Sequence, residues 1–227
     1  VLEHPTIRKL ALTRSLNEGI APYTPVKRLF GGIGNGALIS VNLSFNNIKT
    51  NGDRCIPDYL STNPPLERLY LGENQLTDDD ALHIGLALQS NTNLRFLDLH
   101  DNALTQGGGG VMYLHSVLGY SRSDISPELE SSEVNLNTVS GANHTCEIVG
   151  ILSEEFVQEI FMNDSDKSAK WNRRRKLFAL LFGRHRKGSS VSQLESEFSE
   201  DSMGLVPHVL ACINTYSEDG SNHCLSI

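Results

Sequence analysis

The fold of this 227-residue chain is decided by three segments: Leu38–Ile48 (LISVNLSFNNI), Leu66–Leu76 (LERLYLGENQL) and Leu94–Leu104 (LRFLDLHDNAL). Each begins 28 residues after the one before, and in each an asparagine follows the third of the apolar positions by three residues. The alternation of apolar and polar residues is typical of a short strand with one buried side. A fixed period of this kind predicts stacked equivalent units, because no single unit can bury its own apolar face.

The residues between these segments predict helices that cover the sheet. Thr77–Ser90 starts with a capping threonine and three aspartates and continues with apolar residues at helical spacing. We interpret the aspartates as charges stabilised by the helix N-terminus rather than as a cation site. Gly52–Leu60 and Gly110–Leu118 occupy the same position in their repeats. The sequence therefore predicts an α/β right-handed solenoid, with a parallel sheet inside and helices outside.

The pattern resembles the long, ribonuclease-inhibitor-like class of leucine-rich repeats, and the resemblance covers about residues 7–120. Ile7–Leu12 looks like a worn earlier strand, with Ser15 where the asparagine is expected and a spacing of 31 residues to the next repeat. The segment from Leu136 to Cys146 is similar to a closing segment in mostly uncharacterised repeat families of unicellular algae. That resemblance implies a C-terminal cap followed by a helical tail, and it supplies no activity.

We expect three regions along the chain. Residues 1–128 form the leucine-rich-repeat solenoid, with repeats at 38, 66 and 94 and the worn repeat near 7. Residues 129–188 form a C-terminal cap with a basic helix, and residues 189–227 form an acidic linker and a terminal helix. Because the chain begins with Val1, we also expect it to be part of a longer protein that has more repeats.

Charge is unevenly distributed along the chain. The net charge is -8, yet residues 163–188 hold nine Lys and Arg against two Asp. This balance argues against general nucleic-acid binding and leaves a local role for the block Arg173–Lys176. Three interpretations stay open: a capping helix that buries Leu177, Leu180 and Leu181, a nuclear-import or acidic-partner signal, and a membrane-surface or calmodulin-like segment. A run of 18 apolar residues is absent, so we expect no membrane span.

Cysteine and glycine patterns point to no cofactor and no metal. The four cysteines, Cys55, Cys146, Cys212 and Cys224, form no CxxC pair and predict reduced thiols in a cytoplasmic protein, with import into the nucleus through the basic block as the alternative. Gly32-x-Gly34-x-x-Ala37 with Asp53 mimics a dinucleotide fingerprint, but a strand follows it where a helix is required. Gly107–Gly110 lacks the Gly-Lys-Ser/Thr of a phosphate-binding loop.

The candidate binding site is the concave strand face, where strand residues outside the core point to solvent. Large aromatic residues lie there among charges, which suits an interaction surface. The predicted partner-binding residues are Asn42, Phe45, Arg68, Tyr70, Glu73, Phe96, Asp98, His100 and Asp101. Asn46, Asn74 and Asn102 are predicted to form a structural ladder, because each side-chain amide can bond to backbone groups in the bend after its strand.

These features predict a protein-interaction scaffold, not an enzyme, that acts as a monomer on a protein partner of unknown identity. No nucleophile with a nearby base, no paired carboxylates and no metal-ligand spacing can be read from the sequence. Two alternatives stay open by analogy of fold: a regulator of a small GTPase, and the sensing region of a larger innate-immune-type receptor.

Overall fold

The computed structural model describes residues 7–16, 23–32, 38–105, 107–119 and 135–151, together with residues 169, 172, 173, 176, 177, 180, 206, 207 and 209. The chain divides into two compact units. One consists of Val1–Val117 with Thr145–Leu152, and the other of Leu118–His144 with Ser153–Ile227.

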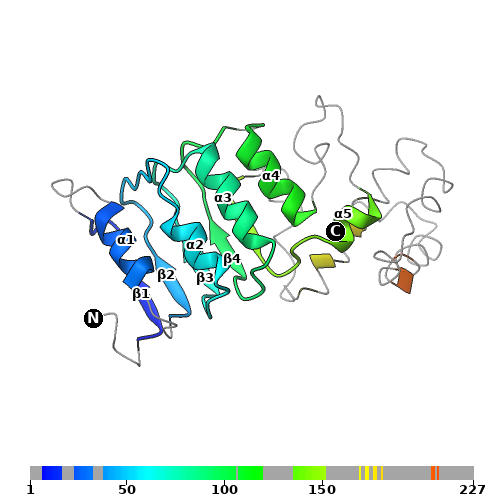
Figure 1. The fold of residues 1–227 in the computed structure, drawn as a ribbon, viewed down its shortest axis with the longest axis horizontal. Coiled ribbons are helices and arrows are strands. Elements are labelled where there is room, and N and C mark those ends of the chain that lie inside the picture. The colour runs from blue at the N-terminus through cyan, green and yellow to red at the C-terminus, as the bar shows by residue number, and fades with distance from the viewer. Residues whose placement is uncertain are drawn as a thin grey trace, which may run out of the picture. The chain divides into compact units, whose positions relative to one another are not determined.

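The first unit is built on a parallel sheet of five strands, each three residues long (Figure 1). The strands lie in chain order: β1 (Lys9–Ala11), β2 (Ser40–Asn42), β3 (Arg68–Tyr70), β4 (Phe96–Asp98) and β5 (Glu147–Val149). Val41 pairs with Leu69 and Leu69 with Leu97, so the register is the 28-residue period of the sequence. The same pairing joins Leu10 to Val41, which places the worn repeat in the sheet.

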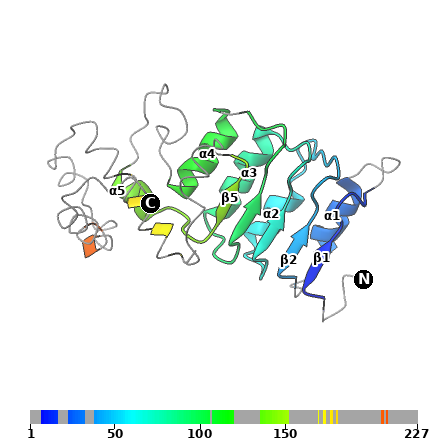
Figure 2. The ribbon, with the colours of Figure 1, turned by 180° about the vertical axis from the view of Figure 1, so that it is seen from behind.

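Four helices cover one face of this sheet. They are α1 (Tyr23–Gly32), α2 (Cys55–Ser61), α3 (Asp78–Leu88) and α4 (Gly109–Leu118). Figure 1 shows them side by side in front of the strands, and Figure 2 shows the strands in front when the unit is seen from behind. This alternation of strand and helix confirms the predicted α/β solenoid architecture.

The core lies between the sheet and the helices. Both apolar positions of each repeated strand segment, such as Leu69 and Leu71, have no exposed surface. The helices contribute residues that are nearly or fully buried, among them Leu60, Ile84 and Leu114. Burial of one leucine side chain contributes about 2 kcal/mol. The repeated leucines are therefore the main source of stability in this unit.

The aspartates at the start of α3 bond within the solenoid. The Asp80 carboxylate accepts hydrogen bonds from the Thr77 backbone N–H at 2.8 Å and from the Thr50 hydroxyl at 2.5 Å. Asp78 accepts the Thr105 N–H at 2.9 Å. These contacts join three successive repeats and agree with the interpretation of the triplet as a helix start.

Asp53 has a structural role between α1 and α2. Its carboxylate accepts hydrogen bonds from Lys27 Nζ at 2.6 Å, Tyr23 Oη at 3.1 Å and the Cys55 N–H at 2.9 Å. Gly34 and Ala37, the other parts of the dinucleotide-like pattern, lie outside the described residues. Cys55 is a free thiol, and burial raises its pKa. Cys212 and Cys224 lie outside the described residues.

The sheet extends past residue 128, the predicted end of the solenoid. Strand β5 pairs with β4, with Phe96 opposite Glu147 and Asp98 opposite Val149. This strand lies within residues 129–188, which the resemblance to the closing segment of the algal families assigns to the cap. Gly150, with φ +87, follows the strand and packs so closely on His100 that a Cβ at this position would collide with the His100 backbone.

The second unit contains the short helix α5 (Leu136–Ser140). Asn135 begins this helix, and its Oδ1 accepts the Thr138 N–H at 2.9 Å. Two described residues of the basic segment bond to the chain that follows α5: Asn172 Nδ2 donates to the His144 carbonyl at 2.9 Å, and Lys176 Nζ to the Asn143 carbonyl at 2.8 Å. Of the three leucines that the capping interpretation expects to be buried, Leu177 is fully buried, Leu180 is half-buried and Leu181 lies outside the described residues. Lys176 is buried too, at 4% exposure. Most of the predicted linker and terminal helix lies outside the described residues.

Candidate functional site

The candidate site is the face of the sheet opposite α1–α4, which we call the open sheet face. It consists of the strand residues that alternate with the buried leucines. The strand register places them in two rows: Lys9, Ser40, Arg68, Phe96 and Glu147 in the first, and Ala11, Asn42, Tyr70, Asp98 and Val149 in the second. The rows therefore contain five of the nine predicted partner-binding residues.

An aromatic pair lies at the centre of this face. The ring centroids of Tyr70 and Phe96 are 5.3 Å apart and the rings are tilted by 47°. Both side chains keep part of their surface exposed, and neighbouring Arg68 is exposed. An aromatic pair beside an arginine has the composition of a protein-binding hot spot.

Asp98 is engaged within the protein. It is only 8% exposed, and its Oδ1 accepts the His100 backbone N–H at 3.1 Å and faces His100 Nδ1 at 2.5 Å. Asn42, which occupies the same row, makes the equivalent bond to the Ser44 N–H at 2.9 Å. The Asp98 hydrogen bond raises the pKa of the His100 imidazole, and partial burial opposes that rise.

The bend after each strand holds a third row of candidate residues. Arg14, Phe45, Glu73 and Asp101 occupy equivalent positions, and all four have left-handed backbone conformations with φ between 48° and 62°. The Arg14 guanidinium lies 4.5 Å from the centroid of the Phe45 ring. Left-handed conformations cost non-glycine residues about 1 kcal/mol each, so the stacking of repeats must enforce them.

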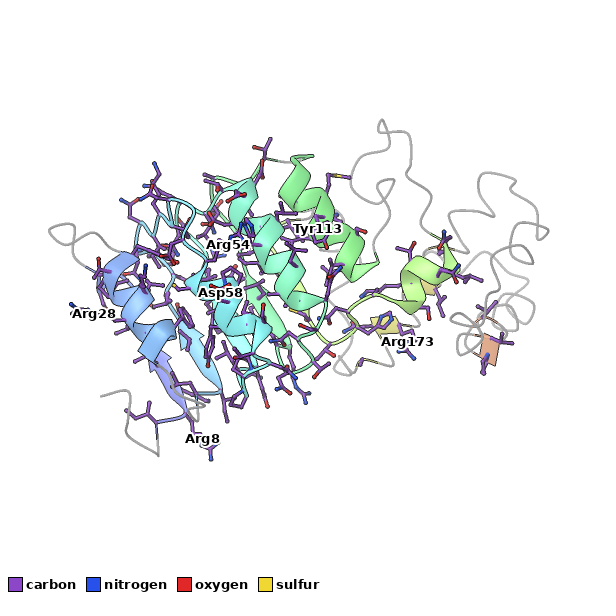
Figure 3. The ribbon with its side chains drawn as sticks, viewed as in Figure 1. Arg8, Arg28, Arg54, Asp58, Tyr113 and Arg173 are labelled. Atoms are coloured by element: carbon purple, nitrogen blue, oxygen red, sulfur yellow. The ribbon has the colours of Figure 1, made fainter. Side chains whose placement is uncertain are left out.

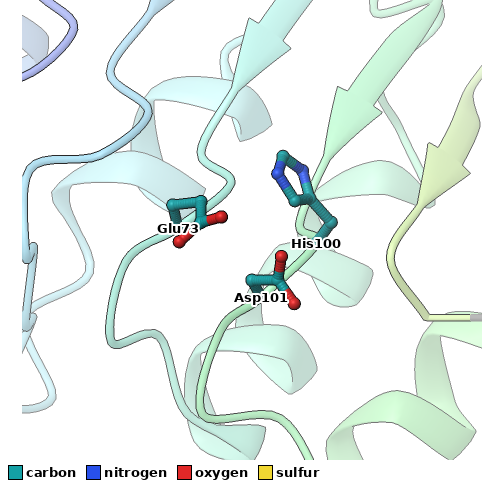
Figure 4. Close-up of side chains that lie close together, drawn as sticks. All are labelled: Glu73, His100 and Asp101. Atoms are coloured by element: carbon teal, nitrogen blue, oxygen red, sulfur yellow. The ribbon is translucent and has the colours of Figure 1, made fainter.

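Three of the predicted site residues lie close together after strands β3 and β4: Glu73, His100 and Asp101. One ligand atom from each of them lies within 4.8 Å of the other two, and Figure 4 shows both carboxylates beside the imidazole ring. The ring also lies against Gly72, where any Cβ would collide with it. The repeats thus bring together three predicted site residues that are up to 28 positions apart in the sequence.

The three ladder asparagines stabilise the bends rather than facing a partner. Asn74 Nδ2 donates to the carbonyls of Leu43 and Leu71 at 3.1 and 2.9 Å, and its Oδ1 accepts the N–H of Asn46 and of Ile48 at 3.1 and 2.9 Å. Asn46 repeats this pattern one unit earlier, where its Oδ1 accepts the Ser15 N–H at 2.9 Å. Asn102 donates to the Leu71 and Leu99 carbonyls, each at 3.0 Å.

The helix side differs from the open sheet face. Arg28, Asp58 and Tyr113 project from α1, α2 and α4 (Figure 3), and the Tyr113 hydroxyl accepts a hydrogen bond from Gln89 Nε2 at 2.9 Å. Leu86 on α3 is a large apolar residue on this side, 47% exposed. Single exposed apolar residues are ordinary on a solvated helix face.

Sequence reasoning missed two residues of the site. Arg14 follows Leu10 by four positions, as Phe45 follows Val41, so the alignment of the worn repeat contained the signal. Gly72 precedes Glu73 and is required by the position of the His100 ring, for which the sequence offered no signal.

Comparison with known proteins adds the name of the repeat. A family model described as Leucine Rich repeat matches residues 62–85 and 90–112. The chain contains leucine-rich repeats. The first match covers β3 and most of α3, the second covers β4 and the start of α4, and strands of the same sheet lie on both sides of them.

One curated protein is similar to part of the chain. The chain is 33% identical over 84 residues to the Caenorhabditis elegans protein named "Protein phosphatase 1 regulatory subunit 37 homolog". The alignment covers 37% of this chain and 9% of the worm protein. No solved structure matches the chain significantly. Within the described residues, the helices are too short or too polar to cross a membrane.

Proposed function

We propose that the chain is a non-catalytic scaffold that binds a protein partner through the open sheet face. The observation that carries this proposal is the half-buried aromatic pair Tyr70–Phe96 beside exposed Arg68, on the side of the sheet that α1–α4 leave uncovered. We infer that the repeats are of the ribonuclease-inhibitor-like class, because an α-helix follows each strand from β1 to β4.

The size of this face limits what it can bind alone. Five strands at about 4.8 Å place the outer strands about 19 Å apart. A standard interface buries about 800 Å² on each partner, which is more than strands of three residues supply across this width. The proposed partner-binding set therefore includes the bend residues Phe45, Glu73, His100 and Asp101 as well as the strand residues Asn42, Arg68, Tyr70 and Phe96. Asp98, which is 8% exposed, supports this set through its bond to His100.

The worm relative is named as a regulatory subunit of a phosphatase. This name favours one partner class, an enzyme that the chain regulates by binding it. The alignment covers 9% of the worm protein, so it supports a regulatory role only through the 84 aligned residues. We propose that the chain acts as a monomer in the cytoplasm. Its edge strands β1 and β5 are three residues long, which leaves little edge for pairing with a second copy. Lys176 is buried, so the block Arg173–Lys176 is not a fully exposed import signal.

The test is a comparison of partner capture by three proteins: the unchanged chain, the double variant Tyr70→Ala with Phe96→Ala, and Leu86→Ala. Leu86 is the matched control, because it is an exposed apolar residue on the helix side. We expect a protein that the unchanged chain captures from lysate to be lost with the double variant and kept with Leu86→Ala. Equal capture by all three would overturn the open sheet face as the binding site.

The enzyme-regulator form of the proposal is tested with purified protein phosphatase 1. We expect a complex in size-exclusion chromatography and a change in the rate at which the phosphatase acts on a phosphoprotein. A phosphatase that elutes alone at micromolar concentrations would overturn this partner class and leave the scaffold proposal to the capture experiment.

A further inference from the structure

We propose that Glu73, His100 and Asp101 form a binding site for a divalent transition-metal cation, with Zn²⁺ as the best fit. One ligand atom from each side chain lies within 4.8 Å of the other two, and the residues come from two neighbouring repeats (Figure 4). This site is a property of the purified chain itself, so it goes beyond the proposed scaffold function and does not depend on it.

The backbone holds the two repeats together at this point. The Glu73 N–H donates to the His100 carbonyl at 2.9 Å. Glu73 and Asp101 occupy equivalent positions in their repeats, and both have left-handed backbone conformations, with φ 56° and 48°. The stacking of the repeats therefore fixes the backbone positions from which the three side chains extend.

Asp98 and Gly72 position the imidazole. His100 Nδ1 lies 2.5 Å from Asp98 Oδ1, and Cε1 and Nδ1 are the ring atoms closest to Gly72. Since Nδ1 faces Asp98, Nε2 is the ring nitrogen that can serve as the ligand. A carboxylate that holds the distal nitrogen of a ligating histidine is the usual arrangement around protein-bound zinc. Asp98 is thus a positioning residue and not a ligand.

Charge and ligand type favour a transition metal. Two carboxylates close together repel each other, and one divalent cation neutralises both. Imidazole nitrogen suits zinc and its neighbours, whereas magnesium and calcium prefer oxygen ligands alone. Ligand atoms around tetrahedral zinc are about 3.3 Å apart, given bonds of about 2.0 Å. Glu73 and Asp101 are exposed, so small rotations of their side chains can close the present separation. Water would complete the coordination.

The site is specific to one junction of the solenoid. In the repeat before it, Phe45 stands at the position of Glu73, and Gly72 stands at the position of His100. The junction between those repeats therefore lacks two of the three ligands. This is also why the sequence revealed no metal motif: the ligands become neighbours only when strands 28 residues apart are stacked.

The test is titration of the full chain with Zn²⁺ by isothermal titration calorimetry, in a buffer that does not bind metal. We expect a micromolar site whose affinity falls at least about tenfold in Glu73→Gln, His100→Gln and Asp101→Asn. Asp98→Asn should also weaken it by about tenfold or more, because loss of the outer carboxylate typically costs 10- to 100-fold in metal affinity. In the unchanged chain, Zn²⁺ should shift the NMR signal of His100 Nε2 and not that of Nδ1.

The matched controls are His83→Gln and Asp79→Asn on α3. His83 Nδ1 lies 3.6 Å from Asp79 Oδ2, so this pair has the same chemistry but lacks the second carboxylate and the positioning aspartate. We expect both controls to keep the affinity of the unchanged chain. Affinity that is insensitive to His100→Gln, or equally sensitive to His83→Gln, would overturn the proposal, as would displacement of Zn²⁺ by an equal concentration of Mg²⁺. Should His100→Gln fail to fold, Glu73→Gln decides alone, because Glu73 is exposed.

Discussion

The solenoid has two kinds of junction between neighbouring strands. From β2 to β4 the paired strands are 28 residues apart, and buried asparagines such as Asn74 bond the bends of successive repeats to each other. At the β4–β5 junction Phe96 pairs with Glu147, which lies 51 residues later. The described contacts there include backbone hydrogen bonds, such as Leu99 N–H to the Val149 carbonyl at 3.0 Å, and the close packing of Gly150 on His100.

The difference shows that parallel pairing does not need the repeat motif. A strand can join the sheet edge wherever its backbone groups meet the free groups of the last strand. The motif adds side-chain bonds that fix the bend and hence the next repeat. We therefore expect substitutions at the regular junctions to act through side chains and those at the β4–β5 junction to act through the backbone.

The largest effect is expected from Asn74→Ala at a regular junction. The substitution leaves the N–H groups of Asn46 and Ile48 without their acceptor and removes the donor to the Leu43 and Leu71 carbonyls. Each orphaned buried group costs about 1–3 kcal/mol, and the losses are not additive. We expect the free energy of unfolding to fall by about 4 kcal/mol in urea denaturation.

The control for this prediction is Gln75→Ala in the same bend. Gln75 is exposed, and its side chain bonds only to the exposed Asn47 among the described residues, so we expect a change below about 0.5 kcal/mol. An Asn74→Ala effect as small as that of Gln75→Ala would show that the ladder asparagines do not stabilise the fold.

The second effect in size is expected at the β4–β5 junction. In Gly150→Ala, a Cβ would be placed at φ +87 and against the His100 backbone, which cannot move aside as a side chain can. Left-handed strain and overpacking together predict a loss of about 3 kcal/mol. Hydrogen exchange should speed up at the Leu99 and Glu147 amides, which bond across this junction, and stay slow at the Leu71 amide, which bonds to β4.

Gly52→Ala separates strain from collision. Gly52 lies in a regular repeat with φ +83, nearly the conformation of Gly150, but a Cβ there would meet nothing within 4 Å. We expect a loss of about 1 kcal/mol from the backbone conformation alone. Equal losses at the two glycines would contradict the close approach of β5 to His100.

The sequence predicted the regular junctions well and the last one poorly. The spacing of Leu38, Leu66 and Leu94 determined strand order, register and the face that carries the helices. Strand β5 has no such signal, because the pairing of Glu147 with Phe96 depends on chain geometry after a long insertion. A sequence period identifies strands that share a motif, and β5 lacks the motif of the strands before it.

The sequence predicted which residues of the candidate site lie side by side, but not the side-chain contacts between them. Aligned repeats are sufficient to place Tyr70 beside Asp98 and Glu73 beside Asp101. They cannot show that Asp98 bonds to His100 or that the ring rests on Gly72, because both depend on side-chain rotamers. Whether the nine predicted residues bind a partner stays a prediction.

The third effect is a dependence of stability on pH that arises near β5. Burial lowers the pKa of His115 from 6.5 to about 4, while a hydrogen bond between its Nε2 and the Ile151 carbonyl at 3.1 Å opposes that shift. Because the unfolded chain binds the proton first, stability is complete above pH 6.5 and falls as the pH decreases toward 4. Between pH 7 and pH 5 we expect a loss of about 2 kcal/mol.

Other groups titrate at low pH too, so the measurement is a difference. Urea unfolding of the unchanged chain and of His115→Gln is compared at both pH values. Glutamine has no proton to gain in this range, and its amide can still bond to the Ile151 carbonyl. A pH dependence that is the same in both proteins would show that His115 does not contribute to it.

The smallest effect concerns the β3–β4 junction, where two side chains of the open sheet face lie in contact across neighbouring repeats. Tyr70 and Phe96 belong to β3 and β4, and their rings are 5.3 Å apart. A double-mutant cycle with Tyr70→Ala and Phe96→Ala should give a coupling energy of about 1 kcal/mol. The control cycle joins Phe96→Ala with Tyr113→Ala, whose side chain projects from α4, and should be additive within about 0.5 kcal/mol. Coupling in the first cycle alone would mean that the aromatic pair is preorganised before any partner arrives. Additivity in both would mean that the two rings are independent contacts, and that the face is shaped by its backbone, as the β4–β5 junction is.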